Sequence, residues 1–255
     1  MALLEVSNLS KAFGGLMAVS GLSFSVEKGQ LVSIIGPNGA GKTTLFNLLT
    51  GIYRPTAGEI LFEGNDIAGC KPFQAARLGI GRTFQRTTVF EGETVLDNVI
   101  IGQSLRLKTG VLGAILRTAG VRHEEQKVRE KARSLLAFVG LAHMEERLAG
   151  QLTEEAEKRL SIAMVLAAEP KLLLLDEPTG GVNLEEIGGL IELVKEIQRS
   201  GVTVCLIEHK MRMVMSMSDH IIVLNYGTNI AEGTPAEVAS NEEVIKAYLG
   251  ARRVA

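Results

Sequence analysis

The stretch Gly36-Pro-Asn-Gly-Ala-Gly-Lys-Thr43 decides the fold, because it matches the pattern G-x-x-x-x-G-K-[ST] in full. The apolar run Leu31–Ile35 precedes it and the run Thr44–Leu49 follows it, so strand, loop and helix come in the required order. Glycines let consecutive backbone N–H groups turn toward one anion, and the following helix directs the positive end of its dipole at the same place. The stretch therefore predicts a phosphate-binding loop and a bound nucleotide.

The residue types around this loop predict separate roles in nucleotide binding. Lys42 supplies a point charge to the β- and γ-phosphates, and the Thr43 hydroxyl is a candidate ligand for Mg²⁺. Upstream, Phe13 is a candidate for stacking on adenine, although a single phenylalanine more often belongs to a core. The candidate nucleotide-binding residues are Phe13, Gly36, Pro37, Asn38, Gly39, Ala40, Gly41, Lys42, Thr43 and Thr44.

The composition is that of a globular protein. The chain has 255 residues, 46% of them hydrophobic, and a net charge of −2, which gives no electrostatic reason to expect nucleic acid as a partner. Cys70 and Cys205 are isolated and indicate reduced thiols of a cytosolic protein. The sequence does not begin like a signal peptide, and no apolar run approaches the ~18 residues that cross a bilayer. If the protein works at a membrane, we expect other chains to span it.

Short β-rich runs alternate with helical patterns, which predicts an α/β fold with a mostly parallel sheet. Dense apolar runs predict central strands at Leu31–Ile35, Leu172–Leu175, Val202–Ile207 and Ile221–Leu224. Alternating runs predict half-buried strands nearer an edge at Leu3–Val6 and Leu22–Val26.

The helical patterns predict how the single domain, residues 1–255, is organised. The core covers about 1–88 and 167–235, a helical subdomain is inserted at about 89–166, and a helical tail covers about 236–255. In the insert, residues 123–139 carry an apolar stripe at helical spacing. The tail starts at a capping box in which Thr234 is the cap, Pro235 takes the first turn and Glu237 closes the box.

Two acids end the apolar run Leu172–Leu175. Asp176 stands where a carboxylate at a strand end holds Mg²⁺ beside a phosphate loop. Glu177 follows it and is a candidate base for a water that attacks phosphate. The alternative, a solvated turn, is weakened by the phosphate-binding loop upstream.

Two further side chains follow predicted strands. Gln85, in Arg82-Thr-Phe-Gln85, is a candidate neutral ligand for Mg²⁺ or the attacking water. His209 closes Val204–His209 and places an imidazole near the expected γ-phosphate. Each signal alone is weak, because a single histidine is usually a satisfied core or surface residue. Their order along the chain carries the argument.

This order of motifs resembles the ATP-binding subunits of ABC transporters across essentially the whole chain, and most closely those of high-affinity branched-chain amino-acid importers. The resembling stretches are Phe13-Gly-Gly-Leu, Thr44-Leu-Phe-Asn-Leu-Leu-Thr-Gly, Gly81-Arg-Thr-Phe-Gln, Thr94-Val-Leu-Asp-Asn-Val, Ile207-Glu-His-Lys-Met, Ala231-Glu-Gly-Thr-Pro and Ala247-Tyr-Leu-Gly. Related importers for urea or amides look much alike.

The resemblance implies an ABC-type P-loop NTPase core with an N-terminal antiparallel β subdomain and an inserted helical subdomain. Two such subunits close head to tail around two ATP molecules, with Mg²⁺ placed by Thr43, Gln85 and Asp176. Glu177 is then the general base, while His209 and Gln85 sense the γ-phosphate.

The resemblance also implies partners. The chain is expected to lie peripherally on the cytoplasmic face of the inner (plasma) membrane, bound to integral membrane permease subunits that an extracytoplasmic solute-binding protein supplies. The surface near residues 89–99 would receive a loop of the permease. No nucleic acid is expected as a partner.

One segment departs from the family pattern. The family signature is Leu-Ser-Gly-Gly-Gln, and aligned through Arg159 this chain reads Leu152, Thr153, Glu154, Glu155 and Ala156. In the family, the serine and the glycine N–H groups bind the γ-phosphate held by the opposite subunit. Thr153 keeps a hydroxyl that can cap the helix, but two glutamates bring negative charge to that N-terminus.

This departure leaves two interpretations. In one, both glutamates point to solvent and the backbone alone faces the ligand. In the other, which we favour, the signature is impaired, the chain works as a heterodimer with a second ATP-binding subunit, and its ATPase activity is weak without that partner.

The expected function is therefore an ATPase that energises uptake of branched-chain amino acids or a similar small polar solute. One alternative is a nucleotide-gated regulatory or degenerate ABC subunit, which has no need for Glu177 or His209. Another is the ATPase of a lipid-export ABC system. A soluble ABC ATPase of DNA repair or translation would usually carry a long coiled-coil insert or two linked ATPase units, and neither is present.

Overall fold

The computed structural model describes residues 2–84, 88–104 and 119–251. Contacts divide the chain into two compact units. The first comprises Met1–Arg82, Lys171–Pro178 and Ile191–Ala255, and the second comprises Thr83–Pro170 and Thr179–Leu190. Each unit is therefore assembled from stretches that are distant in the sequence.

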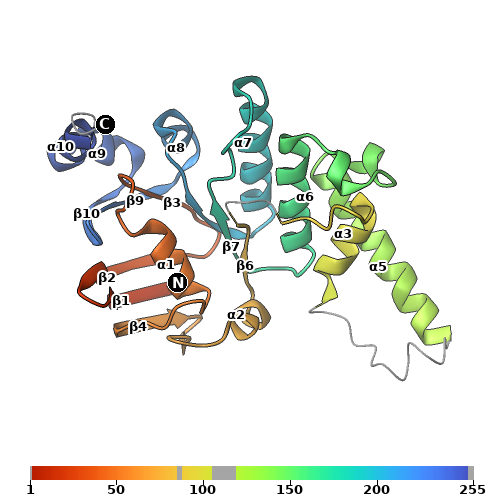
Figure 1. The fold of residues 1–255 in the computed structure, drawn as a ribbon, viewed down its shortest axis with the longest axis horizontal. Helices are drawn as coiled ribbons and strands as arrows, with labels where there is room; N and C mark the ends of the chain where they lie inside the picture. Colours follow the sequence, from red (N-terminus) through yellow and green to blue (C-terminus); the bar gives the residue numbers. More distant parts are fainter. Residues whose placement is uncertain (1, 85–87, 105–118, 252–255) are drawn as a thin grey trace. The chain divides into compact units, whose positions relative to one another are not determined.

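The first unit contains two β-sheets. Its strands are β1 (Ala2–Phe13), β2 (Leu16–Glu27), β3 (Leu31–Ile35), β4 (Ala57–Phe62), β5 (Asn65–Asp66), β6 (Ile80–Arg82), β7 (Leu172–Asp176), β8 (Thr203–Ile207), β9 (His220–Asn225) and β10 (Thr228–Gly233). A four-stranded antiparallel sheet has the order β2-β1-β4-β5, and a six-stranded sheet has the order β10-β9-β3-β8-β7-β6 (Figure 1). The second sheet is parallel except for β10, so the predicted α/β class is confirmed.

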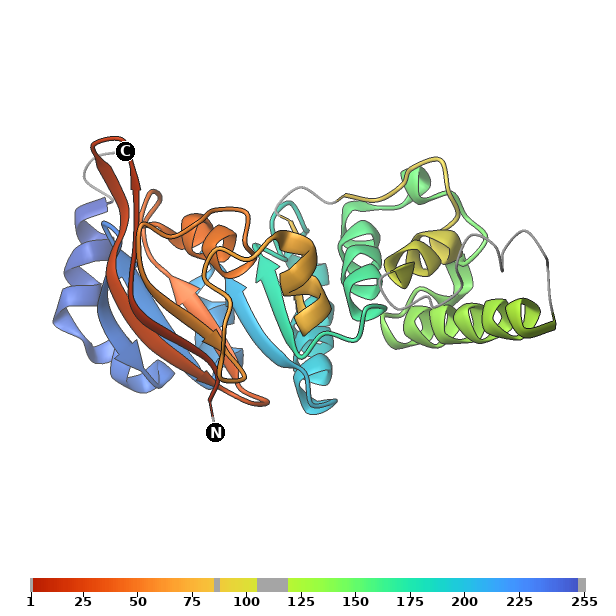
Figure 2. The same cartoon turned by 90° about the horizontal axis from the view of Figure 1, so that it is seen from below.

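The strands predicted from dense apolar runs are confirmed. β3, β7 and β8 are buried at every position, as central strands covered on both faces should be. The two predicted edge strands are longer than their apolar stretches, because β1 and β2 have 12 residues each and pair as one antiparallel hairpin (Figure 2). In such a hairpin, backbone hydrogen bonds between the two strands extend the strands through polar residues beyond their buried parts.

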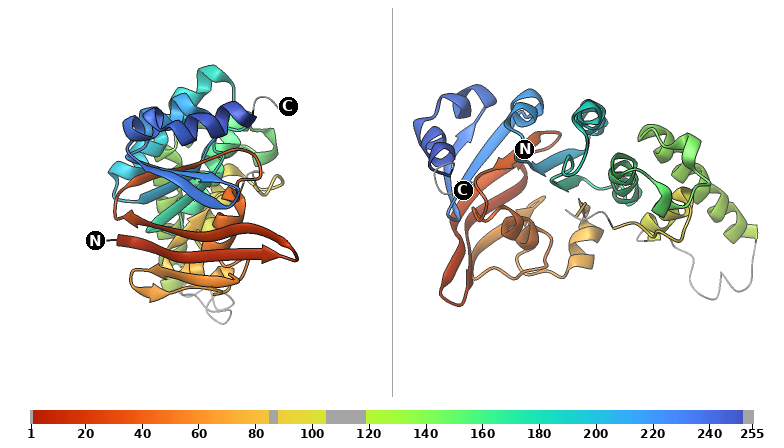
Figure 3. Two further views of the ribbon diagram at one scale, coloured as in Figure 1. Left: turned by 90° about the vertical axis from the view of Figure 1, so that its left-hand side faces the viewer. Right: turned by 45° about the horizontal axis from the view of Figure 1, so that its top comes forward.

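Helices cover both faces of the six-stranded sheet. In this unit they are α1 (Lys42–Leu49), α2 (Pro72–Leu78), α8 (Met211–Met217), α9 (Pro235–Ser240), α10 (Glu242–Ala251) and the end of α7 (Leu184–Arg199). One core cluster joins α1 and the four-stranded sheet to one face, and another joins α8, α9 and α10 to the other (Figures 1 and 3). The predicted capping box of α9 is confirmed, with Thr234 and Glu237 bonded reciprocally after Pro235 takes the first turn.

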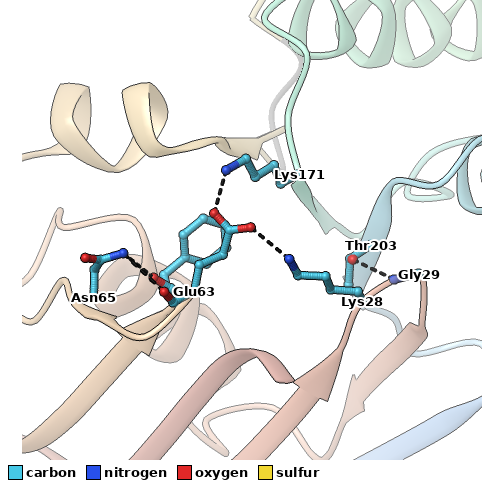
Figure 4. A network of polar contacts seen from close by, with 7 residues as sticks. Lys28, Gly29, Glu63, Asn65, Lys171 and Thr203 are labelled. Atoms are coloured by element: carbon cyan, nitrogen blue, oxygen red, sulfur yellow. Dashed lines mark hydrogen bonds and ion pairs between the residues drawn. The ribbon is translucent and has the colours of Figure 1, made fainter. Parts of the chain in front are cut away.

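A cluster of three charged residues connects turns that belong to the two sheets. Glu63, between β4 and β5, accepts from Lys28 at 3.0 Å and also from Lys171, which precedes β7 (Figure 4). These two bonds lower the pKa of Glu63, the one from Lys171 most. Because all three groups are solvated, the cluster positions these turns more than it stabilises the fold.

The second unit is helical. It contains α3 (Val95–Gly102), α5 (Ala119–Phe138), α6 (Glu154–Leu166), the start of α7 and the short turns η2 (Ala142–Met144) and η3 (Ala149–Gln151). α3 packs on α5 and on α6 (Figure 2). The helix predicted over residues 123–139 is confirmed by α5, whose Ala132 and Leu136 are fully buried. No helix in the described part of the chain is long and apolar enough to span a bilayer.

Candidate functional site

The first unit brings the phosphate loop and the predicted acids to one edge of its parallel sheet. β8 lies between β3 and β7 in the sheet order, and all three run in the same direction. The loop follows β3, Asp176 ends β7, and His209 follows β8 by two residues. Ligands of open α/β sheets bind at the carboxyl ends of strands, which is where these side chains stand.

The glycines at both ends of the loop are required by its backbone. Gly36 has φ +151° and Gly41 has φ +100°, a region that L side chains rarely adopt. A Cβ at Gly36 would overlap the carbonyl oxygen of Leu224, and one at Gly41 would overlap that of Ala18. Residue 41 is also the N-cap of α1, and because glycine has no capping side chain, the first helical N–H groups remain available to an anion.

Lys42 is held by the loop itself. Its side chain is buried, and Nζ donates to the carbonyl oxygens of Gly36 at 2.7 Å and Pro37 at 2.9 Å. Burial lowers its pKa, while the nearby charges of Glu177 and Asp176 act in the opposite direction. Thr43, in contrast, is exposed at the start of α1. The ammonium group of Lys42 therefore lies beside the place where a phosphate would bind.

The two carboxylate oxygens of Asp176 have different surroundings. Its side chain is 2% exposed and Oδ2 accepts from Nη2 of Arg82 at 2.8 Å. Among the residues that the structure describes, Oδ1 is buried without a hydrogen-bond partner. A buried carboxylate oxygen usually has a partner, so Oδ1 fits a Mg²⁺ ion or its water.

Glu177 and His209 form a pair at this edge. Nε2 of His209 lies 2.7 Å from Oε1 of Glu177, and both side chains are partly exposed. The Glu177 backbone adopts φ +50°, which is uncommon outside glycine, and its N–H donates to the carbonyl oxygen of Ile207 at 3.0 Å. The strained turn after β7 thus aims the carboxylate at the imidazole.

Phe13 has neighbours that sequence reasoning missed. Its ring meets that of Tyr53 edge-on at a centroid distance of 5.1 Å, and Nζ of Lys11 lies 4.9 Å from the ring centre. Phe13 stays 41% exposed, so a face remains available for an adenine ring. Tyr53 had no signal in the sequence, whereas Lys11 stands two residues before Phe13.

Gln85 lies outside the described residues. Arg82, three residues earlier, was not singled out as a site residue, yet its guanidinium reaches Asp176. A cation at the end of a predicted strand was the only available sign, and nothing in the sequence indicated which acid it would meet.

The predicted signature segment lies in the second unit at the start of α6. Oγ1 of Thr153 accepts from the N–H of Ala156 at 3.3 Å, so the predicted cap is confirmed. Leu152 is partly buried and Ala156 is buried. Glu154, Glu155 and Glu157 all occupy the first turn, and burial followed by the charges of Glu91 and Glu154 raises the pKa of Glu157.

The two signature glutamates have different surroundings. Glu155 is ion-paired with Arg159, and both side chains are largely buried. Glu154 is exposed, but its carboxylate lies against Gly181, where a Cβ would overlap it. Glu155 therefore does not point freely to solvent, whereas Glu154 is exposed beside Gly181, so the interpretation that both glutamates point to solvent fits Glu154 alone.

Two family models match parts of this chain. A family model described as ABC transporter matches residues 19–180, and a model described as branched-chain amino acid ATP-binding cassette transporter matches residues 228–254.

Individual relatives match along almost the full chain. The chain is 45% identical to the high-affinity branched-chain amino acid transport ATP-binding protein BraF of Pseudomonas aeruginosa, covering 97% of this chain and 98% of the relative. It is 42% identical to LivG of Escherichia coli, a protein with the same description, at the same coverage. Among solved structures, the ADP conformation of an ATP-binding cassette of an ABC transporter matches with TM-score 0.86 and 35% identity, covering 98% of this chain and 99% of the other.

Proposed function

The chain belongs to the ABC transporter family, and from that membership we propose that it is the ATP-binding and ATP-hydrolysing subunit of an importer for branched-chain amino acids or a similar small polar solute. The observation that carries this proposal is the 2.7 Å contact between Glu177 and His209 at the sheet edge that also holds Lys42 and Asp176.

Phosphate binding falls to the loop and to Lys42. The N–H groups at the start of α1 and the Lys42 ammonium surround the β- and γ-phosphates, and they stabilise the charge that develops during transfer. Phe13 stacks on the adenine ring. Mg²⁺, when bound, neutralises charge on the β- and γ-phosphate oxygens, and Thr43, Asp176 and Gln85 are the residues that would hold it.

Glu177 acts as the general base toward the attacking water. Its carboxylate accepts the proton as the water oxygen approaches the γ-phosphorus, and the His209 contact holds it in one orientation. His209 and Gln85 then report the presence of the γ-phosphate to the rest of the chain.

Closure of the site needs a second ATP-binding subunit. In the head-to-tail arrangement of the family, Leu152 to Ala156 face the nucleotide of the opposite chain. Here the first turn of the helix carries three carboxylates, of which only that of Glu155 is paired with Arg159, and the negative charge of the others opposes a phosphate at this N-terminus. Two charges ~4 Å apart repel by about 4 kcal/mol at an effective dielectric near 20. We therefore favour a heterodimer whose partner supplies an intact signature, with weak hydrolysis by this chain alone.

The remaining partners follow from the same function. Integral membrane permease subunits would receive the chain on the cytoplasmic face of the inner membrane, through the surface near residues 89–99. An extracytoplasmic binding protein would deliver the solute to the permease. A purely regulatory role is disfavoured by the Glu177–His209 pair, and a lipid-export role by the branched-chain family match at residues 228–254.

The test is purification of the native membrane complex, followed by vanadate-sensitive ATPase assays. We expect the complex to hydrolyse ATP and its activity to rise when branched-chain amino acids and the binding protein are supplied. The isolated chain should turn over slowly, and addition of the partner ATPase should restore activity. Fast, cooperative turnover by the isolated chain would refute the heterodimer.

A further inference from the structure

Arg82 carries a buried charge whose contacts lie between the acid end of β7 and the helix of the phosphate loop. The residue ends β6, which pairs in parallel with β7, and its side chain is 6% exposed. Nη2 donates to Oδ2 of Asp176 at 2.8 Å. Nη1 donates to Oδ1 of Asn47 at 2.6 Å and approaches Oγ1 of Thr50 at 3.4 Å.

The two acceptors other than Asp176 belong to one helix. Asn47 lies within α1, which begins at Lys42, and Thr50 is its C-cap. Oγ1 of Thr50 donates to the carbonyl oxygen of Phe46 at 2.7 Å, and the Arg82 guanidinium lies 5.5 Å from the Phe46 ring centre. The guanidinium is therefore fixed by α1 from one side and by Asp176 from the other.

These contacts give the two oxygens of the Asp176 carboxylate different roles. Oδ2 is engaged by Arg82, while Oδ1 is buried and has no partner among the described residues. A buried ion pair is costly unless further hydrogen bonds are made, and Nη1 of Arg82 makes such bonds to Asn47 and Thr50. Arginine suits this task because its planar fork donates in two fixed directions, whereas a lysine ammonium is a flexible point charge.

We propose that Arg82 is a positioning residue that fixes the Asp176 carboxylate relative to α1. In this position Oδ1 of Asp176 faces the Mg²⁺ of a nucleotide that is bound at the start of the same helix. The inference rests on the proposed ATP-binding function and adds a residue to it. In this role Arg82 acts through Asp176 and not by contact with nucleotide or metal. It sets the position of one ligand relative to Thr43, at the start of the helix to which it is hydrogen-bonded.

A merely structural ion pair would predict something different. Weakening it would loosen the first unit as a whole and would lower nucleotide affinity with and without metal. A positioning role predicts a selective effect, because the loop amides and Lys42 bind phosphate without Asp176. The diagnostic quantity is therefore the Mg²⁺ concentration that half-maximally tightens nucleotide binding, compared with the affinity in EDTA.

The experiment uses the full chain with Glu177→Gln, so that ATP is not consumed, and fluorescent mant-ATP as the probe. Arg82→Lys keeps the charge but loses the fork, and Asn47→Ala keeps the ion pair but removes the 2.6 Å hydrogen bond to α1. Arg133→Lys is the matched control, because Arg133 makes a 3.0 Å pair with Glu145 in the second unit. Unfolding in urea is measured for each variant.

For Arg82→Lys and Asn47→Ala we expect the half-maximal Mg²⁺ concentration to rise about tenfold while affinity in EDTA changes less than twofold, with no change in the control. Mn²⁺ in place of Mg²⁺ should give a broadened electron paramagnetic resonance spectrum in both variants. An unchanged Mg²⁺ profile, or equal losses with metal and in EDTA, overturns the positioning role. A parent chain that binds no mant-ATP in either buffer overturns the proposed function as well.

Discussion

Glu155 is ion-paired with Arg159 one turn along α6, and Arg159 also donates to the carbonyl oxygen of Val139 at 3.0 Å. Glu155, the second glutamate of the signature segment, is thus held by contacts within the second unit. Its charge is compensated there, which leaves Glu154 as the solvated acid of the pair.

Replacing both acids should restore contact between two copies of this chain. In a Glu177→Gln background we expect the double change Glu154→Gly and Glu155→Gly to increase dimerisation in the presence of Mg²⁺ and ATP, because it frees the helix N-terminus for phosphate. Sedimentation velocity with and without ATP measures this. Glu242→Gly with Glu243→Gly, two acids in the first turn of α10, is the matched control. If the signature change leaves the chain as monomeric as this control, charge is not what prevents closure.

A side chain at Gly181 should destabilise the fold, and more so while Glu154 is present. Its backbone has φ +80°, and a Cβ would overlap the Glu154 carboxylate. We expect Gly181→Ala to lower the free energy of unfolding by about 1–2 kcal/mol. Part of this loss should be recovered by adding Glu154→Ala, which removes the overlap but leaves the backbone strain. Urea denaturation measures all three proteins.

Gly188→Ala is the control for this series, because no atom lies within 4 Å of a Cβ there and the residue is inside α7. It should raise the free energy of unfolding by up to ~1 kcal/mol through helix propensity. Equal losses at both glycines would contradict the proposed clash.

Glu177→Gln should separate binding from hydrolysis. The amide keeps the shape of the side chain but cannot accept the proton of the attacking water, so turnover should fall by roughly 10²–10⁴-fold. ATP affinity should be retained, and ATP should remain intact on the protein after gel filtration. Turnover at the parental rate would exclude Glu177 as the base.

Cys205 should make the fold sensitive to alkali. Complete burial in β8 raises the pKa of its thiol to about 12, whereas the unfolded chain has the ordinary value of 9.0. Because the folded pKa is the higher one, this contribution to stability is complete below pH 9 and is lost as the pH rises toward 12. Cys205→Ala should cost stability at pH 8 through a cavity, and the gap from the parent should narrow at pH 11. A gap that stays constant between the two pH values would contradict this.

How far the sequence predicts the structure depends on the range of each interaction. The phosphate loop, the buried strands and the caps at Thr153 and Thr234 follow from residues within a few positions of one another, and all were predictable. The ion pair of Arg82 with Asp176 was not, because it depends on β6 lying beside β7 in the sheet. The packing of Tyr53 on Phe13 was missed because it also joins residues that are far apart in the sequence.

The sheet order also has a consequence for how the chain is made. β3 lies between β8 and β9, so the strand that carries the phosphate loop gains its first parallel neighbour only when β8 has been synthesised, and both neighbours only when residues near Asn225 have been synthesised. At roughly 5–20 residues per second, the chain from Ile35 to Asn225 takes on the order of 10–40 s to emerge. The helical unit ends at Leu190 and can assemble during this interval. We therefore expect the nascent chain to complete its insert before its nucleotide loop, with an apolar strand in need of protection meanwhile.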